Sequence, residues 1–164
     1  PNNSNIILAA NQAVNLCDDK EIIVIPTKNI PQGIVALINC IPEQSAKENA
    51  DRMKEEIQLV KTGMVTYAVR DTTIDGKEIK ENDYMGIGDS TILSVGQDME
   101  QTTLDMVAEL VDEDVALLSI YYGEDIDKAS AEAFAAKLEE LYPECEIEVN
   151  YGGQPIYYYL ISVE

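Results

Sequence analysis

Residues 115–149 read VALLSIYYGEDIDKASAEAFAAKLEELYPECEIEV, and this stretch decides the fold class. Its apolar, β-rich start at 115–122 predicts a buried strand, residues 128–142 predict a helix, and 146–149 predict a second strand. Strands and helices that alternate in this way are typical of α/β proteins. The stretch therefore predicts the α/β class.

The N-terminal part of the chain repeats the alternation. Asn and Ser residues that can cap a helix precede apolar residues at helical spacing, namely Ile6, Ile7, Ala10, Ala13, Val14 and Cys17. Residues 21–26 read as a short buried strand, and Thr27 to Pro31 supply a cap and an early proline for a helix over 34–41. Because a strand normally feeds the first helix of a wound α/β domain, we expect a strand before Pro1, outside this chain.

The middle of the chain is predicted to be a small antiparallel meander. An amphipathic helix at 46–60 and a strand at 64–69 come before it. Asp-Gly, Asn-Asp and Gly-Asp-Ser turn signals then separate short β-rich pieces between residues 71 and 96. A helix at 103–111 and a last strand at 157–163 complete the predicted order.

These elements predict one domain over residues 1–164. Within it we expect two small α/β sublobes, 1–75 and 97–164, joined by the central antiparallel meander at 76–96.

The charge of the chain restricts its partners. Eleven Lys and Arg stand against 31 Asp and Glu, which gives a formal net charge of −20. Such a charge repels phosphate backbones and anionic headgroups, so we expect neither nucleic acid nor a membrane surface as a direct partner. The acidity is either a solubilising surface or a docking face for a basic partner. The apolar runs are far shorter than a membrane span, and without a signal-type stretch we expect a fragment of a cytoplasmic protein.

The usual catalytic signatures are missing from the sequence. It has no His and no G-x-S-x-G motif. It also lacks both common phosphate-binding glycine loops, G-x-x-x-x-G-K-[ST] and G-x-G-x-x-G. Its three Cys show no metal-ligand spacing, and Asp71, Asp75, Asp83 and Asp89 fit turns better than a calcium loop. We therefore expect no catalytic residue, metal or cofactor in this chain.

Three polar loops are the first candidates for a binding site. Each is predicted at a helix start or after a strand, where open α/β sheets collect ligands. Their candidate residues are Asn2, Asn3, Asn5, Thr27, Lys28, Arg70, Asp71 and Thr72. They either receive an anion or a partner's acidic loop, or they cap helices and pair locally.

A glycine turn near the C-terminus is the second candidate. Gly152, Gly153 and Gln154 form either a tight turn or a loop that cradles a ligand. In the predicted strand that follows, Tyr157 and Tyr159 share one face and Tyr158 takes the other. These tyrosines indicate either an interface or a half-buried edge strand.

Several ordered motifs together carry a family resemblance over nearly the whole chain. They are PNNSN at 1–5, IPTKNIPQG at 25–33, VTYAVRDT at 65–72, Asp75-Gly76, YGED at 122–125 and GGQPIY at 152–157. With these motifs the chain resembles the C-terminal domain of the bacterial fatty acid kinase A subunit, which belongs to a dihydroxyacetone-kinase-related family.

The resemblance implies a role within a larger protein. It implies an N-terminal kinase domain outside this chain that holds ATP and magnesium, and a separate fatty-acid-binding B subunit of the DegV type as partner. It also implies that the two sublobes are related to the DegV-type fold. The parent protein would phosphorylate the acyl carboxylate that the B subunit presents.

Three hypotheses follow for the chain itself. The first is a non-catalytic docking or regulatory domain that engages the B subunit through the candidate loops. The second is a small-ligand or phosphate-binding module that uses the same loops. The third is a dimerisation domain that forms a homodimer through the tyrosine-rich last strand.

Overall fold

A computed structural model describes residues 1, 3–89 and 91–164 of the chain. These residues separate into two compact units, Pro1–Val60 and Lys61–Glu164. We refer to them as the helical unit and the sheet unit. The mixture of helices and a sheet confirms the α/β class.

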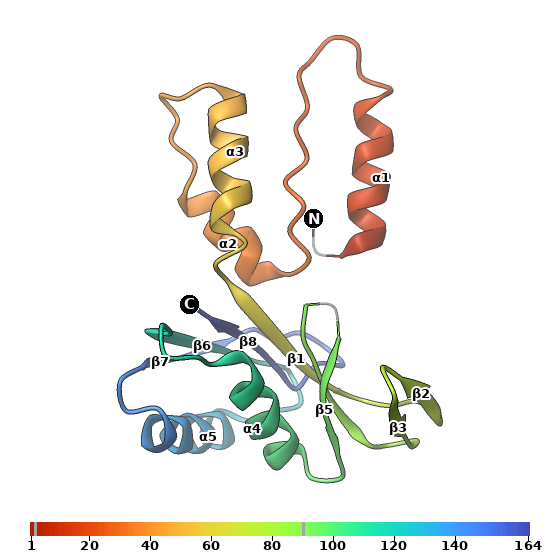
Figure 1. Cartoon of the computed structure of the whole chain (residues 1–164), viewed down its shortest axis with the longest axis vertical. Helices are drawn as coiled ribbons and strands as arrows, with labels where there is room; N and C mark the ends of the chain where they lie inside the picture. Colours follow the sequence, from red (N-terminus) through yellow and green to blue (C-terminus); the bar gives the residue numbers. More distant parts are fainter. Residues whose placement is uncertain (2, 90) are drawn as a thin grey trace. The chain divides into compact units, whose positions relative to one another are not determined.

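The helical unit contains α1 (Ser4–Val14), α2 (Ile30–Ile38) and α3 (Ala46–Glu56) (Figure 1). A polar side chain caps the start of each helix by accepting a backbone N–H bond, as side-chain oxygens do at helix starts. Asn3 accepts from Ile6 at 2.9 Å, and Asn29 accepts from Gln32 at 3.0 Å. Ser45 and Glu48 form a capping box at α3. All three predicted helices are thus confirmed.

The strand predicted at 21–26 is wrong. This segment runs without helix or strand between α1 and α2 (Figure 1). The N–H groups of Ile22 to Ile25 donate to no other residue that the structure describes. A strand requires a neighbour that completes its hydrogen-bond ladder, and the described part of the helical unit supplies none.

The sheet unit is built on six strands in the order β5-β4-β1-β8-β6-β7. Their bounds are β1 (Lys61–Tyr67), β4 (Tyr84–Ile87), β5 (Ile92–Gly96), β6 (Leu117–Tyr122), β7 (Glu146–Tyr151) and β8 (Tyr159–Val163). Neighbours are antiparallel except β6 and β7, which are parallel and are joined by α5 (Lys128–Leu141). This strand–helix–strand unit is the one that residues 115–149 predict.

The predicted meander divides between two sheets. β2 (Thr72–Ile74) and β3 (Lys77–Ile79) form a separate hairpin. Asp75 and Gly76 between them have φ of 53° and 77°, which matches the tight turn that Asp-Gly favours. β4 and β5 instead extend the main sheet beside β1. The two compact units of the structure divide after Val60, and the sublobes expected at 1–75 and 97–164 stay a prediction.

The core of the sheet unit lies on one face of the sheet. α4 (Met99–Leu110) and α5 cover this face together (Figure 1). Met106, Phe134 and Leu138 are almost completely buried there against Val65 and Ile161. Because these helices cover a face and not the ends of the strands, they leave the loops at the strand ends accessible.

Among the described residues, none of the helices has the length and apolarity that crossing a bilayer requires.

Candidate functional site

The carboxyl ends of three strands lie at one edge of the main sheet. β1 and β6 both run antiparallel to β8, and β7 runs parallel to β6. Their carboxyl ends therefore lie at the same edge, where β8 begins. The loops that follow them carry Arg70, Gly123 and Gly153. Strand carboxyl ends are where open α/β sheets commonly bind ligands.

Close backbone packing holds two of these loops together. The Gly123 N–H donates to the Tyr158 carbonyl at 2.8 Å, and the Glu124 N–H donates to the Gln154 carbonyl at 3.1 Å. A Cβ at position 123 would collide with the carbonyl oxygens of Tyr157 and Gln154. Only glycine allows this approach, and sequence reasoning did not single out Gly123 as a site residue.

The glycine turn at 152–154 uses its polar groups within the protein. The N–H groups of Gly152 and Gly153 donate to the Tyr122 carbonyl at 3.0 and 3.2 Å. The Gln154 side chain donates to the Tyr121 carbonyl at 2.8 Å, and Gly153 has a φ of 64°. These contacts favour a tight turn over a ligand cradle, because the two glycine donors are already occupied.

Three tyrosine rings meet at this edge. The Tyr158 ring lies 5.6 Å from the Tyr84 ring and 6.3 Å from the Tyr67 ring, between ring centroids. Tyr67 and Tyr84 face each other across β1 and β4. The Thr66 hydroxyl donates to the Ile156 carbonyl at 3.0 Å and so ties β1 to the loop before β8. Sequence reasoning missed Tyr67 and Tyr84 because their meeting depends on strand register.

We call this cluster the tyrosine rim and define it as Tyr67, Tyr84, Ile156 and Tyr158. Ile156 is 60% exposed and Tyr67 is 39% exposed. Desolvation raises the pKa of Tyr158, and the nearby Tyr84, Asp125 and Tyr67 raise it further. The phenol is therefore neutral at physiological pH and offers the rim a hydrogen-bond donor.

Of the two alternatives for the tyrosine-rich last strand, the structure excludes the edge strand. β8 lies between β1 and β6, so both of its edges are paired and it is not an edge strand. Tyr159 is buried and stacks on Phe134 with centroids 5.0 Å apart. Tyr157 precedes the strand, and Tyr158 points to the rim. Opposite directions for Tyr158 and Tyr159 agree with the predicted alternation.

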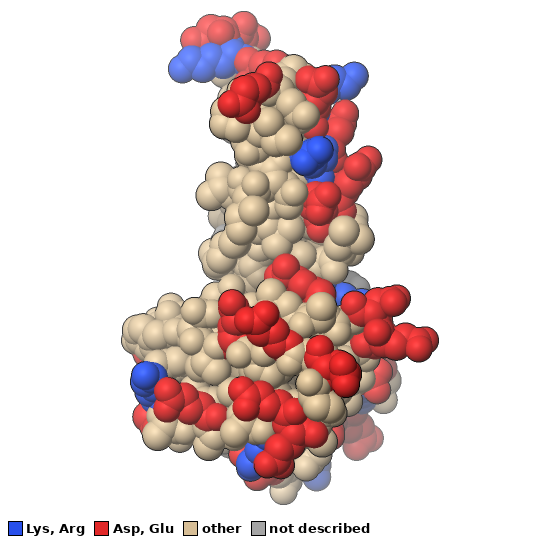
Figure 2. Space-filling model, turned by 90° about the vertical axis from the view of Figure 1, so that its left-hand side faces the viewer, with Lys and Arg blue, Asp and Glu red and all other residues tan. Residues whose placement is uncertain are grey.

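Cations are scarce in the sheet unit. It contains 23 Asp or Glu and six Lys or Arg, and red carboxylates far outnumber blue cations on the face shown in Figure 2. Lys61, Lys128 and Lys137 form ion pairs, and the Lys77 ammonium donates to a backbone carbonyl. Arg70 alone among the predicted site residues is an exposed cation at this edge.

Two predicted residues beside Arg70 have local structural roles. The Asp71 carboxylate accepts the Glu81 N–H at 2.8 Å. Thr72 begins β2 and pairs with Ile79 in the hairpin. Arg70 itself forms no ion pair with any residue in the described ranges. Of the three, Arg70 is therefore the exposed charged residue without an ion pair or structural bond to another described residue.

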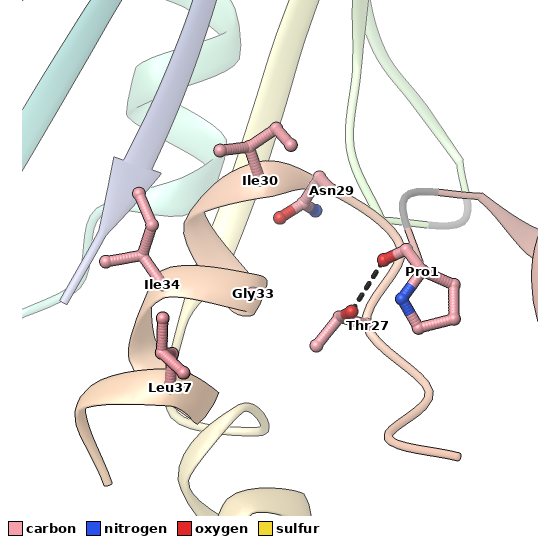
Figure 3. Close-up of a pocket in the computed structure, with 7 residues that line it drawn as sticks. All are labelled: Pro1, Thr27, Asn29, Ile30, Gly33, Ile34 and Leu37. Carbon is pink, nitrogen blue, oxygen red and sulfur yellow. Dashed lines mark hydrogen bonds between the residues drawn. The ribbon is translucent and has the colours of Figure 1, made fainter. Parts of the chain in front are cut away.

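The remaining predicted residues belong to the helical unit. Thr27 is buried, and its hydroxyl donates to the Pro1 carbonyl at 2.6 Å (Figure 3). This bond brings the first two polar loops together. The Lys28 side chain is exposed, while its N–H donates to the Gln32 side chain at 2.9 Å. Asn3 caps α1, Asn5 is exposed in its first turn, and Asn2 lies outside the described residues.

A cavity of about 460 Å³ adjoins these loops (Figure 3). Its described lining is Pro1, Thr27, Asn29, Ile30, Gly33, Ile34 and Leu37. None of these residues is an Asp, Glu, Lys or Arg, so no side chain of this described lining offers a charge to an anionic ligand. Lys28 is adjacent in sequence but does not line the cavity.

The described residues contain no group of three or more Cys, Asp or Glu placed to bind a metal. The four Asp of the meander accept separate hydrogen bonds instead. Asp75 accepts the Ile92 N–H at 3.2 Å, Asp83 accepts the Lys80 N–H at 2.8 Å, and Asp89 accepts the Thr62 hydroxyl at 2.5 Å. Only the Asp83 bond is local and agrees with the interpretation as a turn former. The bonds of Asp71, Asp75 and Asp89 reach residues 10, 17 and 27 positions away and join separate segments.

Comparison with known proteins gives matches over the full chain. The model of the FakA-like C-terminal family, the C-terminal part of proteins like the fatty acid kinase A subunit, matches residues 1–164. Protein YloV of Bacillus subtilis is 45% identical over 164 residues, which are 100% of this chain and 30% of that protein. Uncharacterized proteins of Staphylococcus aureus strains USA300 and MRSA252 are each 43% identical over 164 residues, again 100% of this chain and 30% of each protein. The chain thus spans about 30% of the length of these relatives.

Proposed function

The chain belongs to the FakA-like C-terminal family of the fatty acid kinases, and on this basis we propose that it is a docking domain without catalytic residues of its own. It engages a separate fatty-acid-binding B subunit. An ATP- and magnesium-binding domain elsewhere in the parent protein then phosphorylates the acyl carboxylate that the B subunit presents.

The tyrosine rim with Arg70 is the observation that carries this proposal. Tyr and Arg are enriched in protein interfaces, because a large ring with a polar tip and a planar cation both make many contacts at low entropic cost. The rim is partly exposed, and Arg70 follows β1 only three residues after Tyr67. In a strongly acidic unit, this edge is where a partner's carboxylate meets an available cation beside apolar surface.

The other two hypotheses receive less support from the geometry. A phosphate-binding loop uses available backbone N–H donors, whereas Gly152 and Gly153 already donate to Tyr122. Its candidate loops keep the exposed cations Lys28 and Arg70 but lose these two glycine donors. Dimerisation through the last strand needs an open edge or an exposed tyrosine face, whereas β8 is paired on both sides and Tyr159 is buried. Docking requires neither feature.

Calorimetric titration of the intact parent protein with its B subunit tests the proposal. We expect Arg70→Ala to weaken binding about tenfold or more, because a buried interfacial ion pair loses one partner. Tyr67→Asp places a carboxylate in the rim and is expected to weaken binding further. Lys137→Ala is the matched control, since it removes a cation from a surface pair with Glu100 on the helices.

Two outcomes would distinguish a wrong binding surface from a wrong function. Unchanged affinity for both rim variants would show that the partner binds at another surface. Unchanged affinity after removal of the whole domain would refute the docking function itself.

A further inference from the structure

Residues 21–26 have the composition of a β-strand but no neighbouring strand among the described residues. Ile22, Ile23, Val24 and Ile25 are four consecutive β-branched residues, the type that favours a pleated, buried backbone. No N–H or C=O of Ile22, Ile23 or Val24 bonds to another residue within the described ranges. Ile23, Val24 and Ile25 are nevertheless half-buried. A β-branched run whose backbone groups have no partner within the described ranges is suited to a neighbour that supplies a ladder.

The path of the chain defines where that neighbour would lie. From Pro1 the chain passes through α1 and then returns along residues 15–26. The Thr27–Pro1 hydrogen bond of 2.6 Å closes this circuit. In a strand–helix–strand unit, two parallel strands end side by side and the helix connects the end of the first to the start of the second. In such a unit, α1 corresponds to the connecting helix and residues 21–26 correspond to the second strand.

α1 also has the surface of a helix that should cover a sheet. None of its residues is buried, and Ile6 and Leu8 are 47% and 62% exposed. Residues 1–17 include no Asp, Glu, Lys or Arg in a chain of net charge −20. Helices that face only solvent normally carry charged residues, so an uncharged apolar helix indicates a missing layer.

We propose that Ile22–Ile25 forms a parallel β-ladder with a strand of the same polypeptide that ends at Pro1. The relatives of this chain are long enough to supply it, because the chain spans only 30% of their length. The strand is a near-continuous run of aliphatic residues without charge, since a parallel strand beneath α1 is buried on its faces. It completes the sheet layer of the helical unit and covers Ile6.

Hydrogen–deuterium exchange of the full-length protein and of residues 1–164 tests this inference. We expect the amides of residues 22–25 to exchange near the unprotected rate in the 164-residue chain. In the full-length protein, those that face the new strand should exchange at least about 100-fold more slowly. Amides of β1 and β8 serve as the internal control and should exchange alike in both proteins.

Two other results would overturn the inference. Equal exchange at 22–25 in both proteins would show that the longer chain supplies no strand. Protection that appears only at higher protein concentration, or only when a B subunit is added, would assign the strand to another molecule. The test is independent of the docking surface, which lies on the sheet unit.

A proline pair gives a second measurement. Successive N–H groups of a strand point to opposite edges, so Ile23→Pro and Val24→Pro remove donors from opposite sides. In the full-length protein we expect one variant to lower the folding equilibrium constant of the helical unit at least tenfold more than the other. In residues 1–164 the two should differ by less than about twofold. A similar small effect of both variants in the full-length protein would contradict the ladder.

Discussion

Tyr159 shows at the scale of one residue how burial couples stability to pH. Its side chain is buried and stacks on Phe134. Desolvation raises its pKa to about 12, with smaller contributions from Glu100 and Asp127. An unfolded tyrosine titrates near pH 10. Between pH 10 and 12 the native state therefore retains a proton that the unfolded state has lost, and stability falls as the pH rises through this window.

Tyr159→Phe is expected to remove the contribution of Tyr159 to this pH dependence. The loss of stability between pH 10 and 12 should become less steep in urea unfolding of the variant. Tyrosinate absorbance should lose its highest-pH step. Tyr151→Phe is the control, because the Tyr151 ring is 68% exposed and its replacement should leave that step in place. An unchanged high-pH step in Tyr159→Phe would refute the assignment.

The capping box of α3 is the clearest local signal at the scale of an element. The Glu48 N–H donates to the Ser45 hydroxyl oxygen at 3.3 Å, and the Ser45 N–H donates to the Glu48 carboxylate at 3.0 Å. The hydroxyl and the N–H of Ser45 both donate to the carboxylate and so lower the pKa of Glu48. The cap is therefore complete above the ordinary glutamate pKa and weakens as the pH falls through the lowered pKa.

Ser45→Ala is expected to destabilise the helical unit by about 1 kcal/mol at neutral pH, the usual cost of losing a helix cap. Far-ultraviolet circular dichroism during urea unfolding measures the loss. Ser45→Thr keeps the hydroxyl and should restore most of the stability. Equal stability of Ser45→Ala and the unmodified chain would mean that the box contributes nothing.

The sequence predicted an element well where the signal for it lies in a few neighbouring residues. Caps located the helices, and Asp75-Gly76 located the hairpin turn. The strand at 21–26 was predicted wrongly because a strand depends on a neighbour, which composition does not reveal. For the same reason the sequence did not place β8 inside the sheet or bring Tyr67 to Tyr84. Candidate site residues in loops were found, but their hydrogen-bond partners depended on the packing of distant segments.

The sheet unit carries a complete core at the scale of the whole molecule. The buried residues that pack against α4 and α5 all lie between Val65 and Val163. β1 occupies an interior position and pairs with β4 on one side and β8 on the other. A fragment that starts at Lys61 keeps every strand of the sheet. A fragment that starts at residue 76, near the boundary expected from sequence, loses β1 and leaves two strands without their common neighbour.

We therefore expect residues 61–164 to fold alone and residues 76–164 to remain unfolded. The longer fragment should unfold cooperatively in urea, with a free energy of roughly 5–15 kcal/mol. Salt should stabilise it, because 23 acidic and six basic residues leave a large net negative charge whose self-repulsion is screened by ions. The shorter fragment should show no cooperative transition, since interior β1 holds β4 and β5 to the rest of the sheet. Cooperative unfolding of residues 76–164 would support the boundary after residue 75.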